Sequence, residues 1–307
     1  MTRAAALAAA WLILIASAAS PVDAVGQDAG APLGAPIDLS TFRVRRTIPP
    51  GPPGLTALTL DPSALAHSRI VDVRVATADG RQVPYLIERL DQPLAVTLPA
   101  LRKAGGDEPR LPPAGGGARS VYRLHMPGAG LPPSQLILQT SAPVFDRSIQ
   151  IVASPQGNGR KSRDVTAWTV VSARWRHANP GNVPPPLTLD LPRLGSEEAW
   201  LVVNEGDNQP LPLAEPRLLL PAYRLRFVRP TEAPLLLLYG RDDLDAPRYD
   251  LALLAPRLLE TEAREVRAAP EAPAPAGGAQ FTTRLFWGAL VLAVAVLLIL
   301  VVRLVRQ

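Results

Sequence analysis

The sequence contains no cysteine among its 307 residues. This absence excludes disulfide bonds, thiolate nucleophiles and cysteine-ligated metal sites, and it also excludes a lipid anchor on an N-terminal cysteine. Disulfides usually reinforce small domains in oxidising compartments. If the chain is exported, its domains must therefore be held together by core packing alone.

Aromatic residues and lysine are also scarce, whereas proline is abundant. Phe, Trp and Tyr make up 5% of the chain, Lys103 and Lys161 are its lysines, and 35 residues are proline. The net charge is +5, but the arginines are scattered among acidic residues, with no basic run beside an aromatic ladder. This pattern indicates an ordinary solvated surface, and we expect no nucleic-acid partner. The many prolines favour short strands joined by turns over long helices.

Local catalytic and metal-binding motifs are missing from the sequence. It has no GxSxG, SxxK or HExxH motif, no P-loop, and no GxGxxG that follows a strand. Its histidines, His67, His125 and His177, lack metal-ligand spacing, and we expect them to be surface or packing residues. We therefore predict no enzyme, no cofactor and no metal site. A hydrolase remains an alternative, because a catalytic triad can assemble from distant strands.

One long apolar run lies near the end of the chain, from Leu285 to Val302. It contains no charged residue and no proline, and at ~1.5 Å per residue it would form about 27 Å of helix, close to the ~30 Å hydrocarbon core of a bilayer. We predict a transmembrane helix at 285–302. Arg303 and Arg306 lie in the tail at 303–307, and their charge agrees with a cytoplasmic location for that tail.

The first residues, 1–24, are typical of a secretory signal peptide. Arg3 supplies a positive start, an apolar stretch too short to span a membrane follows, and Val22-Asp23-Ala24 forms a cleavage site of small residues. An earlier site at Ala16-Ser17-Ala18 and an uncleaved anchor are alternatives. With the terminal helix, this signal predicts a single-pass protein of the inner (cytoplasmic) membrane whose N-terminal bulk lies in the periplasm.

Short runs with two-residue periodicity dominate the region between the two ends, among them residues 42–48, 70–76, 121–126 and 147–153. Their spacing predicts a mainly β fold, an antiparallel β-sandwich of jelly-roll type plus a smaller β unit. The predicted order is a disordered lead-in at 25–40, a small β domain at 41–102, a linker at 103–118, a β-sandwich at 119–260 and a Pro/Ala-rich stalk at 261–284.

Three local patterns refine this order. Asp79-Gly80 is a tight-turn dipeptide, and it predicts a hairpin between 70–76 and 82–88. Residues 249–260 alone look helical. The linker has an alternative interpretation as a long surface loop inside one domain.

Several motifs of the second β region occur together as a set. They are VFDRSIQIVAS, then LTLDL, then AWLVVNEGDNQPLPL, and the chain adds DGRQVPYLIER before them and PRYDLALLAPRL after them. The set resembles galactose-binding-like (discoidin-type) jelly-roll domains. The whole chain resembles an uncharacterised bacterial envelope family, a domain of unknown function of the 3999 type found beside multi-pass envelope membrane proteins. The resemblance implies a fold and an envelope membrane-protein partner, and it supplies no catalytic residues.

A few residues of this region are candidates for ligand binding. Asp207 and Asn208 lie in the EGDNQP loop, where they can hydrogen-bond a sugar hydroxyl, although the motif also builds a turn without a ligand. Asp146 and Arg147 are adjacent opposite charges at a strand start. Trp175 approaches a loop and is a candidate stacking platform for a sugar ring, with core packing as the alternative. We expect core positions for Trp168 and Trp200.

An acidic loop, GRDDLDAP, offers a further possibility. The carboxylates of Asp242, Asp243 and Asp245 are spaced as in some calcium sites, but the Gly and Glu of an EF-hand are missing. Arg241 and Arg248 flank the loop and can pair with the carboxylates instead. We therefore predict a solvated turn.

These observations lead to one functional expectation and two alternatives. We expect a membrane-anchored, periplasm-facing β-sandwich protein that acts as a non-enzymatic binding or assembly module of the cell envelope, with an envelope membrane protein as its partner. The first alternative is a carbohydrate-binding module for envelope polysaccharide. The second alternative is the hydrolase.

Overall fold

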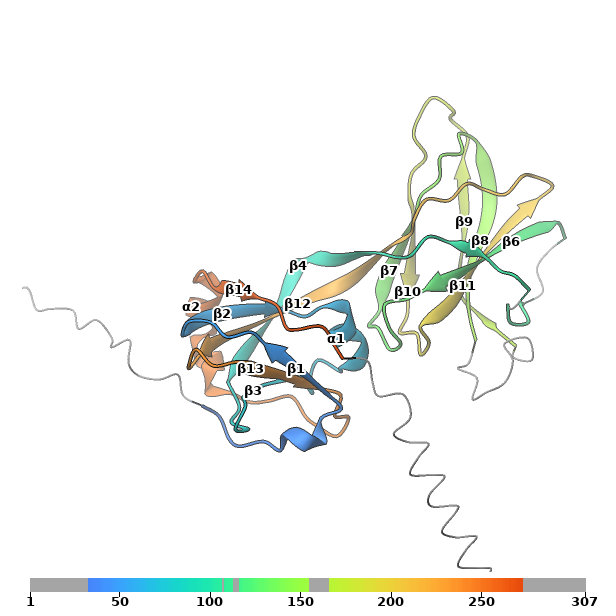
Figure 1. The fold of residues 1–307 in the computed structure, drawn as a ribbon. Coiled ribbons are helices and arrows are strands. Elements are labelled where there is room, and N and C mark those ends of the chain that lie inside the picture. Colours follow the sequence, from blue (N-terminus) through green and yellow to red (C-terminus); the bar gives the residue numbers. More distant parts are fainter. Residues whose placement is uncertain (1–32, 107, 113–115, 155–165, 273–307) are drawn as a thin grey trace, which may run out of the picture.

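The computed structural model describes residues 33–106, 108–112, 116–154 and 166–272 (Figure 1). As the sequence predicts, it is mainly β, with 46% strand and 9% helix, and it contains several antiparallel sheets. Its helical elements are η1 (Leu39–Thr41), α1 (Pro62–His67), η3 (Asp250–Leu254) and α2 (Ala255–Glu260). Its strands are β1 (Val44–Ile48), β2 (Gly54–Thr59), β3 (Arg74–Thr77), β4 (Tyr85–Thr97), β5 (Arg102–Lys103), β6 (Ala118–His125), β7 (Ser134–Leu138), β8 (Phe145–Ala153), β9 (Trp168–His177), β10 (Leu187–Leu191), β11 (Glu198–Gly206), β12 (Arg217–Arg229), β13 (Leu235–Tyr239) and β14 (Arg264–Val266).

Three sheets build two lobes, which Figure 1 shows side by side. A three-stranded sheet has the order β1-β13-β3, a five-stranded sheet has the order β5-β6-β11-β8-β9, and a third sheet has the order β10-β7-β12-β2-β14 with β4 also paired to β12. The first lobe comprises β1–β3, β13, β14, the helices, and residues 85–90 and 222–229 of the two long strands. The second lobe comprises β5–β11 with residues 94–97 and 217–220.

The strands β4 and β12 pass through both lobes. In the second lobe, Arg217–Leu219 of β12 pair with β7, and in the first lobe Arg224–Arg229 pair with β2. The β4 ladder follows β12 along its length and shifts register between Leu220 and Ala222. Pro221 lies at this shift, as expected for a residue that cannot donate to a ladder. The two lobes therefore share one continuous two-stranded ribbon, formed by β4 and β12.

This pairing differs from the division predicted at 41–102 and 119–260. Residues 222–272 belong with the first lobe, because β12 and β14 both pair with β2, and β13 pairs with β1 and β3. Two-residue periodicity predicts that a strand exists but not which strand it pairs with. Local patterns therefore could not show that residues after 222 pair with strands of the first lobe. The turn at Asp79-Gly80 is present: Gly80 has φ of 82°, and Thr77 N–H donates to the Arg81 carbonyl at 2.9 Å. The predicted hairpin is limited to a single bridge between Ala76 and Gln82, because β3 pairs with β13 and β4 with β12. The helical prediction for 249–260 is also confirmed by η3 and α2.

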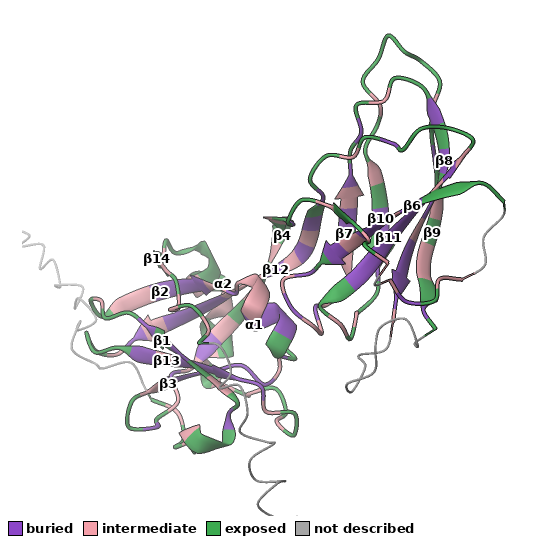
Figure 2. Ribbon diagram, turned by 45° about the vertical axis from the view of Figure 1, so that its right-hand side comes forward, coloured by how far each residue is buried: buried purple, intermediate pink, exposed green. Residues whose placement is uncertain are grey.

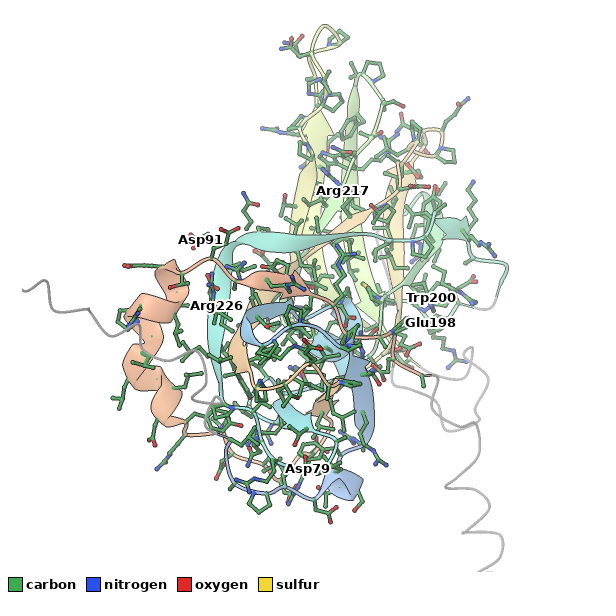
Figure 3. All side chains as sticks on the ribbon, turned by 60° about the vertical axis from the view of Figure 1, so that its left-hand side comes forward. Asp79, Asp91, Glu198, Trp200, Arg217 and Arg226 are labelled. Atoms are coloured by element: carbon green, nitrogen blue, oxygen red, sulfur yellow. The ribbon has the colours of Figure 1, made fainter. Side chains whose placement is uncertain are left out.

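The second lobe has a core between its sheets and a smaller one outside. Leu201 and Val203 of β11 face the main core, whereas Trp200 and Val202 face a cluster that includes Ala104 and Leu111. Figure 2 shows buried residues following the inner strands of both lobes, and Figure 3 places Trp200 and Glu198 together on the second lobe. Part of the predicted linker thus covers the central strand.

The predictions for two of the tryptophans have different outcomes. Trp200 is buried, as predicted. Trp168 is 50% exposed, so its predicted core position is wrong. The reason is that β9 is an edge strand of the five-stranded sheet and Trp168 is its first residue, beyond the shelter of the facing sheet.

Several predicted segments fall partly or wholly outside the described residues. The predicted signal peptide at 1–24 and the predicted transmembrane helix from Leu285 to Val302 lie there, with the tail at 303–307 and the first half of the lead-in at 25–40. Among the residues that are described, no helix is long and apolar enough to cross a membrane. The start of the predicted stalk is described as far as Ala272, and it contains β14, which pairs in parallel with β2.

Candidate functional site

An open polar groove lies on the second lobe, where β8 begins and β11 ends. It has a volume of about 610 Å³. Its lining comes from β8, β9, β11, the turn after β11 and the residue two before β6. It consists of Gly116, Asp146, Ser148, Arg174, Asn204, Glu205, Gly206 and Asn208. The lining is rich in hydrogen-bonding side chains and holds no large apolar one. We call this site the polar groove.

Alternation along β8 separates two neighbouring charges. Successive side chains of a strand point to opposite faces, so Asp146 is exposed in the groove while Arg147 is buried behind it. The Arg147 guanidinium donates from Nε to Glu205 Oε2 at 2.8 Å and to the backbone oxygens of Asp146 and Gln209 at 3.0 and 3.4 Å. Glu205 is buried too, and its Oε1 accepts from the Leu211 N–H at 3.2 Å. This buried ion pair ties the start of β8 to both ends of the turn at 205–211.

The turn itself is built by short-range hydrogen bonds. The N–H and the side-chain Nδ2 of Asn208 both donate to the Glu205 carbonyl, at 3.1 and 3.0 Å, and Gly206 N–H donates to Asn204 Oδ1 at 3.1 Å. Gly206 has φ of 60°, a conformation that glycine adopts without strain. Gly117 packs directly against it, since a Cβ at that position would lie 2.8 Å from the Gly206 Cα. The EGDNQP motif is therefore a turn in which Asn208 has a structural role.

The floor of the groove carries an exposed ion pair. Arg174 of β9 donates from Nε to Asp146 Oδ1 at 2.7 Å and from Nη2 to Oδ2. These hydrogen bonds hold the pKa of Asp146 below its usual range, so its carboxylate stays ionised near neutral pH. Ser148 lies on the same face of β8, two residues on. The groove thus offers hydrogen-bond donors and acceptors that are held by the ion pair and the turn.

The structure brings together part of the residue set predicted from sequence. Asp146 and Asn208 line the groove, Arg147 supports it from behind, and Asp207 is exposed in the adjoining turn but is not part of the lining. Trp175 is 3% exposed. Its ring packs edge-on against Phe145 with centroids 5.0 Å apart, and its Nε1 donates to the Pro185 carbonyl at 3.0 Å. Trp175 is a core residue, and its burial leaves no free ring face for a sugar.

Sequence reasoning missed several lining residues, among them three polar ones from strands. Arg174, Ser148 and Asn204 reach the groove because β8 pairs with both β9 and β11, with Ser148 opposite Arg174 on one side and Asn204 on the other. Alternation after Asp146 was a signal for Ser148. The other two depend on the strand partners, which the sequence did not supply.

A second, smaller hollow borders the exposed Trp168. It has a volume of about 340 Å³ and lies between the end of β8, the start of β9 and the β10–β11 connection. The indole is accompanied by hydroxyl and guanidinium side chains. The lining is Ala153, Ser154, Trp168, Thr169, Val170, Pro192, Arg193, Leu194, Gly195 and Ser196.

Residues of the acidic loop at 240–247 make contacts with arginines of the protein. Arg241 pairs with Asp243 at 2.8 Å and Arg43 with Asp242 at 3.1 Å, while Arg74 donates to the Asp245 carbonyl. Within the described ranges, no three His, Cys, Asp or Glu residues are grouped so as to hold a metal ion.

No histidine is among the residues that line the polar groove. The His67 ring lies 2.9 Å from Glu271 in the first lobe, and His177 contacts the Asn182 carbonyl at 3.1 Å.

No protein-family model matches this chain, and no curated protein matches it at a significant level.

Proposed function

We propose that this chain is a non-enzymatic binding or assembly module of a bacterial cell envelope. In this proposal, residues 285–302 anchor it in the inner membrane, residues 1–24 direct its export, and both lobes face the periplasm. Its partner is another envelope membrane protein, as the resemblance to the uncharacterised envelope family implies. The second lobe has the galactose-binding-like jelly-roll form of β-sandwich.

The observation that carries the proposal is the construction of the polar groove. The buried Arg147–Glu205 pair fixes the turn and the start of β8 against each other, so the exposed side chains are held in position before any ligand arrives. A pre-organised surface loses less conformational entropy on binding. The charges of the exposed Asp146–Arg174 pair neutralise each other. Both features suit recognition by hydrogen bonds.

The test is affinity capture of the full-length chain from cross-linked membranes. A double variant, Asp146→Ala with Arg174→Ala, removes the exposed pair of the groove. The matched control is Arg43→Ala with Asp242→Ala, which removes an equally exposed arginine–aspartate pair from the first lobe. We expect one membrane protein to be captured by the wild type and the control and to be lost with the groove variant. If the wild type, the groove variant and the control all capture the same protein equally, or all capture none, the proposal is contradicted.

Carbohydrate binding is a second candidate, and the half-exposed Trp168 favours it. Aromatic faces bordered by polar side chains are suited to stack on pyranose rings while hydroxyls hydrogen-bond nearby. The lining of the smaller hollow provides Thr169, Arg193 and Ser196 for such bonds. The test is a glycan array probed with the full-length chain in nanodiscs, beside the Trp168→Ala variant. Binding that Trp168→Ala abolishes supports this candidate, and an array without signal removes it.

A further inference from the structure

An apolar helical segment on the first lobe remains uncovered by the rest of the described chain. It spans η3 and α2, residues 250–260, and none of its residues is buried. Leu253 is 84% exposed, and Leu254 and Leu259 are also exposed. Soluble surfaces commonly show single apolar residues, but a cluster on one short segment marks a docking surface. We call these three residues the leucine ridge.

The leucine ridge continues into an apolar cleft of about 670 Å³. Leu254 belongs to both, and Leu33, Ile37, Leu244 and Leu251 contribute further apolar side chains to the cleft. Arg248 and Asp250 also line the cleft, and Arg257 and Glu260 are exposed beside the ridge. The result is one apolar surface flanked by side chains of both charges.

The ridge is held in place rather than hanging free. The guanidinium of Arg226 donates from Nη1 to the carbonyls of Leu258 and Thr261 at 3.0 and 2.7 Å and from Nε to Glu88 at 2.8 Å. At the other end, the Tyr249 hydroxyl donates to Gln82 at 2.8 Å. Figure 3 places Arg226 on the lobe that carries α2. With both ends fixed in this way, the leucines stay exposed.

The chain beyond the ridge limits what can cover it. Residues 264–271, which we call the strap, run back along the first lobe: β14 pairs with β2, Ala269 N–H donates to the Thr47 carbonyl at 2.7 Å, and Tyr239 donates to Glu271 at 2.9 Å. Of the stalk predicted at 261–284, the described part up to Ala272 is held on the first lobe, so twelve residues separate it from the predicted anchor at 285–302. About a dozen residues span at most ~40 Å. The first lobe is tethered within that distance of the predicted anchor.

We infer that the leucine ridge and the apolar cleft dock on the phospholipid bilayer that holds the anchor. This inference rests on the membrane anchoring in the proposed function. The tether keeps the lipid surface permanently within reach, so docking is intramolecular and has a high effective concentration. Leucines at the headgroup boundary bury apolar area in the bilayer, and Arg248 and Arg257 are placed to contact lipid phosphates while Asp250 and Glu260 face water. The first lobe then lies against the membrane and the polar groove of the second lobe remains accessible.

The absence of cysteine makes a direct test simple, since one introduced thiol is the only one. Leu253→Cys in the full-length chain is labelled with an environment-sensitive nitrobenzoxadiazole dye and reconstituted in phosphatidylcholine–phosphatidylglycerol vesicles. The matched control is Val183→Cys, at an aliphatic residue of the second lobe that is 89% exposed. We expect spin-labelled lipid to quench the dye at position 253 at least threefold more than at 183, and iodide in the buffer to show the reverse order.

The outcomes separate this inference from the proposed function. Equal quenching at both positions overturns bilayer docking. A blue-shifted dye at 253 that lipid does not quench means that a protein or a second copy covers the ridge, which also overturns it. A chain that fails to float with the vesicles overturns both the docking and the anchoring. Adding Leu254→Glu should release the dye to iodide, whereas Asp146→Ala with Arg174→Ala should leave the lipid quenching unchanged. The opposite result from either variant would count against the inference.

Discussion

The two lobes present opposite kinds of surface. The polar groove of the second lobe is made by strands, and its exposed charges are paired and its support is buried. The leucine ridge of the first lobe is made by a short helical segment with no buried residue and several uncovered leucines. Strand alternation spaces polar groups at fixed intervals, whereas a helical segment at a lobe rim can leave a whole apolar side uncovered. One chain thus carries a surface for hydrogen bonds and a surface for apolar contact.

The largest expected effect follows from breaking the support of the polar groove. Glu205→Gln leaves the Arg147 charge buried without its partner, and we expect a loss of about 3–5 kcal/mol in the free energy of unfolding. Chemical denaturation followed by tryptophan fluorescence measures it, because Trp168, Trp175 and Trp200 all lie in the second lobe. The control is Glu198→Gln on the same strand, which removes an exposed pair with Arg123 and should cost less than about 1 kcal/mol. Equal losses would show that burial does not distinguish the two pairs.

The next comparison sets a leucine of the core against a leucine of the ridge. Leu201→Ala in β11 removes a fully buried side chain and should destabilise the chain by about 2–5 kcal/mol. Leu253→Ala in η3 should change stability by less than about 0.5 kcal/mol when the chain is in detergent, because its side chain is already exposed. Thermal unfolding followed by circular dichroism gives both values. A large loss at Leu253 would mean that the ridge is covered within the protein itself.

Acid should weaken the first lobe through two of its carboxylates. Burial alone would raise the pKa of Asp61, but hydrogen bonds from Arg46 and from the Ala64 N–H outweigh it and lower that pKa. Hydrogen bonds from Arg224 lower the pKa of Glu88 against a smaller effect of burial. The ordinary pKa values of the two groups are 3.8 for Asp61 and 4.5 for Glu88. Each carboxylate therefore stabilises the folded state at a pH above its ordinary pKa. This stabilisation is lost as the pH falls from the ordinary pKa through the lowered pKa of the folded state.

The measurement for this acid effect is the denaturation midpoint between pH 6 and about pH 3. We expect the midpoint to fall below about pH 4.5, and to fall less steeply in Asp61→Asn than in the wild type. A matching variant in the second lobe is Asp146→Asn, whose carboxylate is exposed, and it should alter the profile less. A profile that is flat down to pH 3 would contradict the assignment of Asp61 and Glu88.

Two tryptophans of β9 set a small expected effect on stability against a larger one. Trp168→Ala should change the free energy of unfolding by less than about 1 kcal/mol, because half of the side chain is exposed on an edge strand. Trp175→Ala, seven residues along the same strand, should cost about 3–5 kcal/mol because that ring is buried. Denaturation followed by circular dichroism compares the two. A similar cost at both positions would argue that Trp168 is covered and cannot serve as a stacking platform.

Local patterns predicted the elements well and their partners poorly. The runs at 42–48 and 147–153 became β1 and β8, Asp79-Gly80 formed its turn, and 249–260 became η3 and α2. The same periodicity gave no sign that β12 pairs with β4 and β2, because pairing over a long sequence separation leaves no local trace.

Only part of the candidate site was predicted, because the rest of it depends on which strands pair. Asp146 and Asn208 were identified from their own loops, whereas Arg174 enters the groove through the pairing of β8 with β9. The residues of Ala263–Arg267, AREVR, were assigned to a stalk because proline and alanine surround them. Their short β14 is stabilised by β2 and by the Arg46 side chain, which donates to the Ala269 carbonyl at 2.6 Å.

The strap also decides where mechanical tension enters the molecule. A pull on the chain beyond Ala272 reaches Glu271 and Ala269 first, and their contacts are with α1, β13 and β1. Only when these contacts part does the pull reach β14 and, through β2, the strand β12 that both lobes share. The contacts of the strap with α1, β13 and β1 would therefore resist such a pull before the strands that build the polar groove do.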